Sequence, residues 1–387
     1  MFEYQKSGRY FGQIAEGIEE IGREEIERLG AREARPAYRG LHFLADPSAL
    51  YRVNYCSRLL TRVLAPLRLF DCPDTDALYR AGRSLDWPSL FSPQRTFAID
   101  ANVSNSRLRH SRYAAQKLKD AIADRFREAR GIRPSVDPRN PDVRISLHIH
   151  ADRATVGIDT SGGSLHRRGY RAASVEAPMQ ETLAAAIVRF SEWNGDRPLV
   201  DPMCGSGTLL AEALMSAARI PAGYLRSAFG FRFLPDFDGE AWRRVKEEAD
   251  GEIRGIPAGL IEGSDVSPEA AAAAKANLRL LPGGERVRVR VRRFQEHPGI
   301  EEGVVLCNPP YGVRLGRGED LGRLLKELGD FLRRRCALST ALVYFGDREL
   351  AKRVELRPKW KKALRNGGLD GRLVRYDLYE WKKDAKP

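Results

Sequence analysis

From Pro198 onward, the sequence alternates short apolar segments with helix-forming stretches. Strand-like segments occupy PLVDP (198–202), LIEGSDV (260–266) and EGVVLCNPPYG (302–312), and helical patterns follow the first two. Strands that alternate with helices pair side by side in a parallel sheet that helices cover. The final segment, ALRNGGLDGRLVRYDLYEW, has a glycine-rich turn between two strand-like halves. The sequence therefore predicts a mostly parallel α/β sheet that ends in an antiparallel hairpin.

The first 160 residues are patterned differently. Apolar residues at helical spacing predict an amphipathic helix from Ile14 to Leu29, and a second helix covers 113–130. Residues 141–160 alternate apolar and polar side chains, as a pair of strands does. The segment 159–178 is rich in glycine, serine and arginine and has no apolar period. We therefore expect an α+β region followed by a domain boundary in that segment.

Composition narrows the class of protein. A chain of 387 residues exceeds the ~250 residues at which single cores stop growing, and 42% hydrophobic with 30% charged residues is typical of soluble globular proteins. No run approaches the ~20 apolar residues that span a bilayer, and the N-terminus lacks a secretory pattern. The five cysteines show no CxxC spacing, which disfavours a zinc site and a disulfide framework. We expect a cytoplasmic protein without a membrane partner.

The net charge of +13 favours a polyanionic partner, because arginine and lysine contact phosphates and release counterions. RNA and DNA both fit, and charge alone also fits a solvated surface. His148 and His150 alternate onto one face of a strand, as metal ligands can. No third ligand is apparent, so we expect these histidines to pack and no metal to bind.

The segment Asp201-Pro-Met-Cys-Gly-Ser-Gly-Thr208 connects a strand to a helix, where an open α/β sheet binds its ligand. Its two close glycines allow a cofactor to approach the backbone. A dinucleotide fingerprint needs a third glycine where Leu210 stands, and the Lys-Ser/Thr of a P-loop is absent. The spacing disfavours NAD and ATP. We interpret 201–208 as a loop for another cofactor, with a plain turn as the alternative.

Two further strand ends carry polar residues. Asp265 can accept hydrogen bonds from both hydroxyls of an adenosine ribose, although it also suits the start of the helix at Ser267. Asn308-Pro309-Pro310-Tyr311-Gly312 suits an exocyclic amine, whose lone pair is delocalised into a base. The Asn308 side-chain oxygen and the Pro309 carbonyl can each accept one N–H, and Tyr311 can stack on an extruded base. The alternative is a proline turn after a strand.

Together, DPMCGSGT and NPPYG resemble the class I S-adenosylmethionine (SAM) dependent methyltransferases that act on exocyclic amines. LHRRGYR, APMQETLAAAI, SRLLTRVL and KLKDAIADRFR narrow the resemblance to THUMP-containing bacterial 23S rRNA guanine-N2 methyltransferases, RlmL-like, over nearly the whole chain. The domains that this resemblance implies are a ferredoxin-like subdomain over 1–55, a THUMP RNA-binding domain over 56–160, a linker over 161–178 and a Rossmann-like methyltransferase domain with a seven-stranded sheet over 179–387.

The resemblance also implies roles for individual residues. Asp201, Gly205 and Gly207 would line the methionine side of SAM, Asp265 its ribose, and the start of the catalytic domain would cap the methionine end. The expected cofactor set is Pro178, Glu181, Thr182, Asp201, Pro202, Cys204, Gly205, Ser206, Gly207, Thr208, Asp265, Phe294 and Asn308; the expected set at the target amine is Asn308, Pro309, Pro310 and Tyr311. Arg167, Arg168 and Arg171 would contact RNA phosphates or solvate a hinge.

Two departures from the family pattern bear on function. Many relatives carry an acid that contacts the adenine amine where this chain has Arg293, between Arg292 and Phe294. The well-known members continue into another methyltransferase domain, whereas this sequence ends at Pro387, so we expect one methylation. The expected substrate is 23S rRNA or a large-subunit precursor. The alternatives are a tRNA guanine-N2 methyltransferase, an adenine-N6 DNA methyltransferase and a noncatalytic RNA-binding assembly factor.

Overall fold

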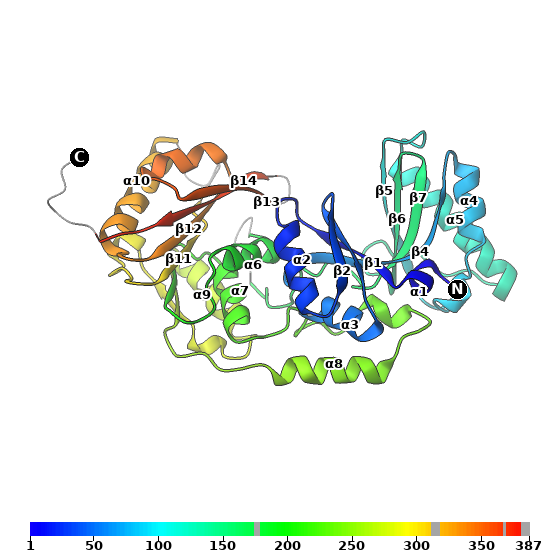
Figure 1. Cartoon of the computed structure of the whole chain (residues 1–387), viewed down its shortest axis with the longest axis horizontal. Helices are drawn as coiled ribbons and strands as arrows, with labels where there is room; N and C mark the ends of the chain where they lie inside the picture. Colours follow the sequence, from blue (N-terminus) through cyan, green and yellow to red (C-terminus); the bar gives the residue numbers. More distant parts are fainter. Residues whose placement is uncertain (174–178, 311–317, 367–368, 381–387) are drawn as a thin grey trace. The chain divides into compact units, whose positions relative to one another are not determined.

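The chain forms two compact units, and neither is one continuous stretch of sequence (Figure 1). The structure is a computed structural model that describes residues 1–173, 179–310, 318–366 and 369–380. Each unit contains one seven-stranded sheet within these ranges. Unit 1 comprises Met1–Ile14, Gly22–Leu165 and Arg226–Glu248, and unit 2 comprises Ala15–Ile21, His166–Leu225 and Ala249–Pro387.

The sheet of unit 1 is mixed, in the order β2-β3-β1-β4-β7-β6-β5. Among the described strand pairs of this sheet, only β5–β6 is parallel. Strand β4 is 12 residues long and pairs with β1 on one edge and with β7 on the other, so it joins the two halves into one sheet. The strands are β1 (Arg9–Ile14), β2 (Arg32–Ala37), β3 (Gly40–Leu44), β4 (Leu60–Asp71), β5 (Phe97–Ser104), β6 (Val143–His150) and β7 (Arg153–Asp159).

Helices α4 and α5 pack against each other in unit 1 (Figure 1). Gly82 permits this approach, because a Cβ added there would lie 2.7 Å from Cδ1 of Leu118. The predicted helix over 113–130 and the predicted strand pair are confirmed as α5, β6 and β7. The helices that lie wholly or partly in unit 1 are α1 (Glu3–Ser7), α2 (Glu19–Arg28), α3 (Pro47–Cys56), α4 (Thr75–Arg83), α5 (Ser111–Arg130) and α8 (Gly239–Gly251).

The predicted helix from Ile14 to Leu29 starts too early. Ile14 is the last residue of β1, and the helix begins only at Glu19. Between them the chain turns at Gly17, whose φ of +88° favours glycine, and the Glu19 carboxylate accepts the Gly17 N–H at 2.8 Å. Apolar spacing continued across this turn, which is why the pattern alone extended the helix.

An arm of the sequence between α7 and β9, residues 226–248, packs within unit 1. Its aromatic residues surround two tyrosines of α3: the Tyr51 ring lies 4.6 Å from that of Phe231, and the Tyr55 ring 5.3 Å from that of Trp242. The hydroxyl of Tyr4 donates to the Asp236 carboxylate at 2.5 Å. The packing of this arm was not among the sequence-based predictions.

The sheet of unit 2 has the order β10-β9-β8-β11-β12-β14-β13. The neighbouring strands β10, β9, β8, β11 and β12 pair in parallel. Strand β14 is antiparallel to both β12 and β13. The predicted mostly parallel sheet with a terminal hairpin is therefore confirmed (Figure 1). Its strands are β8 (Leu199–Asp201), β9 (Ile261–Asp265), β10 (Arg288–Val291), β11 (Val304–Cys307), β12 (Thr340–Phe345), β13 (Trp360–Asn366) and β14 (Leu369–Asp377), and its helices are α6 (Glu181–Phe190), α7 (Thr208–Ala217), α9 (Pro268–Leu278) and α10 (Gly318–Arg335).

The core of unit 2 forms around its central strands. All four residues of β11 are fully buried, and helix α10 packs Leu325, Leu328 and Leu332 into the same cluster. Burial of apolar surface stabilises the folded state by about 25 cal/mol per Å². This core therefore stabilises the strands whose ends carry the polar residues. Among the described residues, no helix is long and apolar enough to cross a membrane.

Candidate functional site

Three polar residues that the sequence singled out meet at one edge of the unit 2 sheet. Asp201 is the last residue of β8, Asp265 is the last residue of β9, and Asn308 follows β11 directly. These strands are adjacent and parallel in the order β9-β8-β11. Because the carboxyl ends of parallel strands lie on one edge, the three side chains border the crevice where such sheets bind ligands.

The loop after β8 depends on its two glycines. Gly205 and Gly207 have φ values of +52° and +82°, which side-chain-bearing residues rarely adopt. A Cβ on Gly207 would also lie 3.0 Å from Cβ of Ala274 in α9. Gly207 then caps the N-terminus of α7. The loop therefore presents bare backbone next to a helix N-terminus, which suits close approach of a ligand.

Asp265 holds this loop in place. One oxygen of its carboxylate accepts the Gly205 N–H at 2.9 Å, and the other accepts the Ser267 N–H at 2.9 Å. Each carboxylate oxygen has a second lone pair. Ribose hydroxyls can therefore still donate to Asp265, and the predicted ribose contact stays a prediction.

Asp201 is a buried acid with a single backbone partner in the described part of the chain. Its side chain accepts the Met203 N–H at 3.2 Å and is 1% exposed. Burial raises the pKa of Asp201 to about 8, and the negative charge of Asp265 adds to the rise, while the Met203 hydrogen bond opposes it. A cationic group beside Asp201 would stabilise the charged carboxylate, so this acid fits a ligand that carries such a group.

Asn308 carries an acceptor atom that is buried and unused. Its Oδ1 is shielded from solvent, and no described residue donates a hydrogen bond to it. Buried polar atoms in native proteins nearly always have partners, so this oxygen fits a ligand donor. Pro309 is buried and Pro310 is partly exposed beside it. Tyr311 and Pro178 lie outside the described residues.

The start of the catalytic region adjoins the glycine loop through Arg171. Its guanidinium donates to the Glu181 carboxylate at 2.9 Å, to the Met179 carbonyl at 3.0 Å and to the Thr208 hydroxyl at 3.4 Å. Glu181 and Thr182 are buried in the first turn of α6. Arg171 thus connects Glu181 with Thr208 instead of lying on an open surface, and the cofactor contacts expected of Glu181, Thr182 and Thr208 stay predictions.

Arg168 is also an internal residue. Its side chain is 1% exposed, and its Nε donates to the Glu212 carboxylate at 3.2 Å, which the Tyr170 hydroxyl shares at 3.2 Å. A guanidinium buried in this way does not present itself to an RNA phosphate. Of the three arginines with an expected phosphate contact, Arg167 alone is exposed, and its contact stays a prediction.

Arg292 and Arg293, which follow β10 where many relatives carry an acid, lie in different surroundings. Arg292 donates to the Glu262 carboxylate at 2.8 Å, whereas Arg293 precedes the short 3-10 helix Phe294–Glu296. Phe294 is 4% exposed and packs with its ring 5.9 Å from that of Phe331. The adenine contact expected of Phe294 stays a prediction, and Arg293 offers no acceptor for an adenine amine.

The sequence interpretation missed Asn277. This side chain is 1% exposed and lies on the alanine-rich face of α9 that meets the glycine loop. A single polar residue on an otherwise apolar helix face was the available signal, because such a residue needs internal partners.

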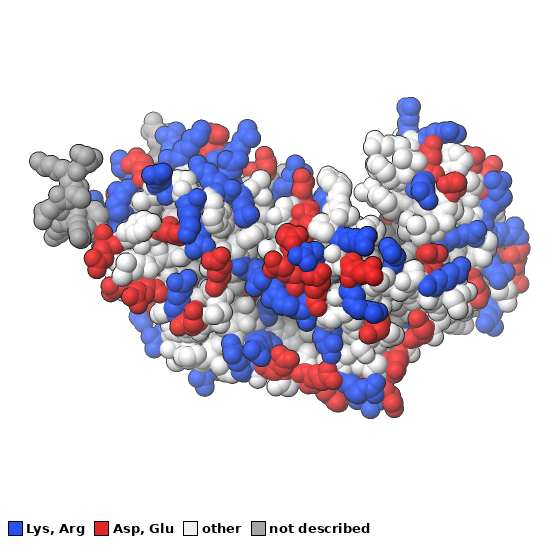
Figure 2. All heavy atoms as spheres, in the orientation of Figure 1, with Lys and Arg blue, Asp and Glu red and all other residues white. Residues whose placement is uncertain are grey.

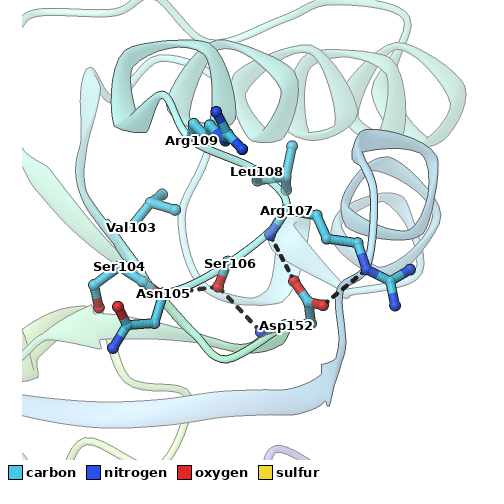
Figure 3. Close-up of a pocket in the computed structure, with 8 residues that line it drawn as sticks. All are labelled: Val103, Ser104, Asn105, Ser106, Arg107, Leu108, Arg109 and Asp152. Carbon is cyan, nitrogen blue, oxygen red and sulfur yellow. Dashed lines mark hydrogen bonds and ion pairs between the residues drawn. The ribbon is translucent and has the colours of Figure 1, made fainter.

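A second candidate surface lies in unit 1, where β5 ends and α5 begins (Figure 3). An open hollow of about 640 Å³ is formed there by the loop after Ser104 and by Asp152. The Asp152 carboxylate accepts the Arg107 backbone N–H at 2.8 Å and pairs with its guanidinium at 3.1 Å. Arg109 is exposed and forms no ion pair with a described residue. The lining residues are Val103, Ser104, Asn105, Ser106, Arg107, Leu108, Arg109 and Asp152.

The two histidines of β6 are exposed, so the expectation that they pack is wrong. Their outward position follows from strand alternation, in which the apolar neighbours Leu147 and Ile149 take the buried face. His150 Nδ1 lies 3.0 Å from the Ser104 hydroxyl. Among the described residues, no group of three or more His, Cys, Asp or Glu side chains is arranged to hold a metal.

On the face that Figure 2 shows, basic side chains gather most clearly over α10 and β14. Helix α10 ends in three consecutive arginines, Arg333, Arg334 and Arg335. Acidic side chains are interspersed, so the excess of positive charge is spread over both units. A positively charged surface of this kind suits contact with a polyanion.

Family models match three consecutive parts of the chain. An RlmL ferredoxin-like domain covers residues 10–64, a THUMP domain covers 72–159, and an RMKL-like methyltransferase domain covers 168–375. A relative from Synechocystis sp., named as a candidate RNA methyltransferase, is 38% identical over 96% of this chain and 97% of its own length. The "Ribosomal RNA large subunit methyltransferase K/L" of Syntrophotalea carbinolica is 39% identical over 96% of this chain.

The chain spans 54% of that K/L protein and 52% of the one from Photobacterium profundum, to which it is 37% identical. Two solved structures match nearly the whole chain. The SMU.472 protein, a candidate methyltransferase complexed with SAH, superposes with a TM-score of 0.84 at 28% identity, covering 97% of this chain and 99% of its own. A Listeria monocytogenes protein described as a predicted N6-adenine-specific DNA methylase gives 0.84 at 27%, covering 96% and 97%.

The strand order, the glycine loop, the polar strand ends and these matches agree with one another. The chain therefore belongs to the RMKL-like family of SAM-dependent methyltransferases, in the group that carries an RlmL-type ferredoxin-like domain and a THUMP domain.

Proposed function

We propose that this protein methylates the exocyclic N2 amine of a guanine in 23S rRNA, by direct transfer to a base that has left its helix. The observation that carries the proposal is the buried Oδ1 of Asn308, which has no described donor and lies at the sheet edge next to the glycine loop. An amine with two N–H bonds supplies the donor that this oxygen lacks.

Asn308 would act by orienting the amine. The N2 lone pair of guanine is delocalised into the ring, so the amine is a poor nucleophile until its geometry changes. One N–H donated to Asn308 Oδ1 and the other to the Pro309 carbonyl would direct the lone pair away from the base plane. Tyr311 would stack on the extruded base. Methylation forms the N–C bond as the S–C bond of SAM breaks, so S-adenosylhomocysteine leaves and the methylated amine releases one proton to solvent. Asn308 itself takes up no proton.

Residues of the glycine loop would hold the cofactor. Gly205 and Gly207 leave room for it, Asp201 would pair with its amino group, and Asp265 would accept its ribose hydroxyls. When bound, SAM supplies an electrophilic methyl group on a positively charged sulfur. Asp201 then gains a cationic partner for a carboxylate whose pKa is otherwise raised.

Unit 1 would bind the RNA through its backbone phosphates. Its residues 72–159 match the THUMP model, and the hollow at Arg109 lies within that range. An exposed guanidinium beside an open polar hollow suits a backbone phosphate, which positions an RNA without reading its sequence. Arg167 is a further exposed candidate for such a contact.

The alternatives differ in substrate and not in the chemistry of the site. A tRNA guanine-N2 methyltransferase would use the same amine-binding residues, and a DNA adenine-N6 enzyme would use NPPY on another amine. A noncatalytic assembly factor would have no need for the raised pKa of Asp201 or for an unused acceptor on Asn308. These two features favour an enzyme.

The test is methylation with tritiated SAM, followed by digestion to nucleosides and chromatography. Deproteinised 23S rRNA, bulk tRNA and double-stranded DNA should be offered separately. The proposal predicts labelled N2-methylguanosine from 23S rRNA and none from the other two. Label in tRNA guanine or in DNA adenine would replace the proposed substrate, and absence of label in all three would contradict catalysis on naked nucleic acid.

A further inference from the structure

Two residues of helix α9, about one helical turn apart, contact the glycine loop 201–208. Ala274 lies against Gly207, where an added Cβ would approach its Cβ to 3.0 Å. Asn277 donates its Nδ2 to the carbonyl of Ser206 at 3.0 Å. Residues three apart lie on the same face of a helix, so this face of α9 is the surface on which the loop rests.

Asn277 also binds a second backbone segment. Its Oδ1 accepts the N–H of Ala173 at 2.9 Å, and its Nδ2 donates to the carbonyl of the same residue at 2.8 Å. One buried amide thereby joins the glycine loop to the chain that enters the catalytic region. With 1% exposure, all of its polar contacts in the described chain are to protein backbone.

Arg171, two residues before Ala173, also connects the entering chain to the glycine loop. It binds the carbonyl of Met179 and the carboxylate of Glu181, and it reaches the hydroxyl of Thr208, the first residue of α7. Ser206 and Thr208 are the loop residues on either side of Gly207. The loop is thus tied from Asn277 at Ser206 and from Arg171 at Thr208.

We propose that Asn277 is a positioning residue for SAM binding, and that Arg171 assists it. The inference rests on the proposed role of 201–208 as the cofactor loop. Asn277 does not touch the cofactor. It fixes the carbonyl of Ser206, and with it the direction of the neighbouring backbone amides, before the cofactor arrives. A loop held in its binding conformation loses less conformational entropy on binding.

The test is calorimetric titration of the full-length protein with S-adenosylhomocysteine, comparing wild type with Asn277→Asp. A carboxylate keeps the shape and accepts from Ala173, but it cannot donate to the two carbonyls. We expect Kd to rise by about tenfold or more, in line with the loss of buried hydrogen bonds. At saturating SAM, kcat should stay within about twofold, because the reacting groups are unchanged.

Asn54→Asp is the matched control. Asn54 is 0% exposed, lies on helix α3 in unit 1 and makes its own buried hydrogen bonds to Leu50 and Thr160. It should lower the unfolding temperature as Asn277→Asp does while leaving Kd within about twofold of wild type. A general loss of stability therefore does not mimic the expected result.

The outcomes are distinguishable. Wild-type Kd in Asn277→Asp, with wild type itself binding, would overturn this inference alone. No binding by wild type would contradict the proposed cofactor loop and this inference together. Should Asn277→Asp fail to fold, Arg171→Lys decides, because lysine keeps the charge but cannot form the same set of contacts. We expect Arg171→Lys to weaken binding, and an unchanged Kd would overturn the inference.

Discussion

The carboxylate of Asp265 accepts the backbone N–H of Gly205 at 2.9 Å, so the end of β9 fixes the loop that follows β8. The residue expected to hold the ribose therefore also shapes the site that surrounds it. Its second oxygen binds the Ser267 N–H at the start of α9. One acid thus couples the glycine loop to the helix that supports it.

Asp265→Asn should weaken SAM binding more than the loss of a ribose contact alone. The amide offers one acceptor oxygen and places its NH2 group against a backbone donor, so one of the two backbone contacts, to Gly205 or to Ser267, is lost. We expect Kd to rise by about tenfold or more, the effect of about 1.4 kcal/mol. Calorimetry measures this. Glu285→Gln, an exposed charge removal in the same unit, should leave Kd unchanged, and equal affinities of the three proteins would refute the coupling.

The affinity for SAM should depend on the charge of Asp201. Because the pKa of Asp201 is raised to about 8, the acid is mostly protonated at neutral pH without a ligand. A cationic ligand favours the carboxylate, so binding should release a proton and strengthen between about pH 6 and pH 8. Titrations in buffers of different ionisation enthalpy report the released proton. Asp201→Asn should bind weakly and without this pH dependence; a pH-independent wild type would contradict the assignment.

Asp201 should also affect stability with the opposite sign. The folded-state pKa of about 8 lies above the 3.8 of the free side chain, so the folded protein keeps a proton that the unfolded chain releases. This group therefore lowers the free energy of unfolding as pH rises from 3.8 toward 8. In the absence of ligand, Asp201→Asn should lose less stability than wild type over this pH interval. Denaturant unfolding at several pH values tests this, and parallel pH profiles would contradict it.

Arg109→Ala should weaken RNA binding by removing one phosphate contact. The slope of log K against log salt concentration should fall by about one for that contact. Arg130→Ala is the matched control, because Arg130 ends the 20-residue helix α5 that starts beside the hollow, ~30 Å along its axis. Both variants lose one positive charge. Filter binding to 23S rRNA at several salt concentrations should separate them, and equal slopes would show that only the net charge matters.

The arm 226–248 should make the catalytic region dependent on unit 1. Deletion of residues 1–165 would remove Tyr51 and Tyr55 and expose Phe231 and Trp242, which now pack against them. We expect an aggregating protein, since large exposed apolar patches promote association. Replacing 226–248 by a short glycine-serine linker in the same truncated protein should restore solubility. A truncated protein that is soluble with its arm would contradict this account.

The sequence was sufficient where local pattern decides the structure. Alternating strands and helices predicted the unit 2 sheet, and since Asp201, Asp265 and Asn308 follow strands, their meeting at one edge followed from topology. The burial of Arg168 could not be predicted, because its partner Glu212 lies 44 residues away and a charged side chain is usually exposed. The packing of the arm 226–248 could not be predicted for the same reason, because its partners Tyr51 and Tyr55 are distant in sequence.

The proposed methyl transfer would depend on Asn308, and one comparison tests that dependence most directly. Single-turnover transfer from SAM to 23S rRNA should be measured for wild type and Asn308→Ala, with S-adenosylhomocysteine affinity measured on the same preparations. We predict unchanged affinity and transfer slowed by at least ~100-fold, because the acceptor that orients the amine is missing. Undiminished transfer by Asn308→Ala would contradict the account.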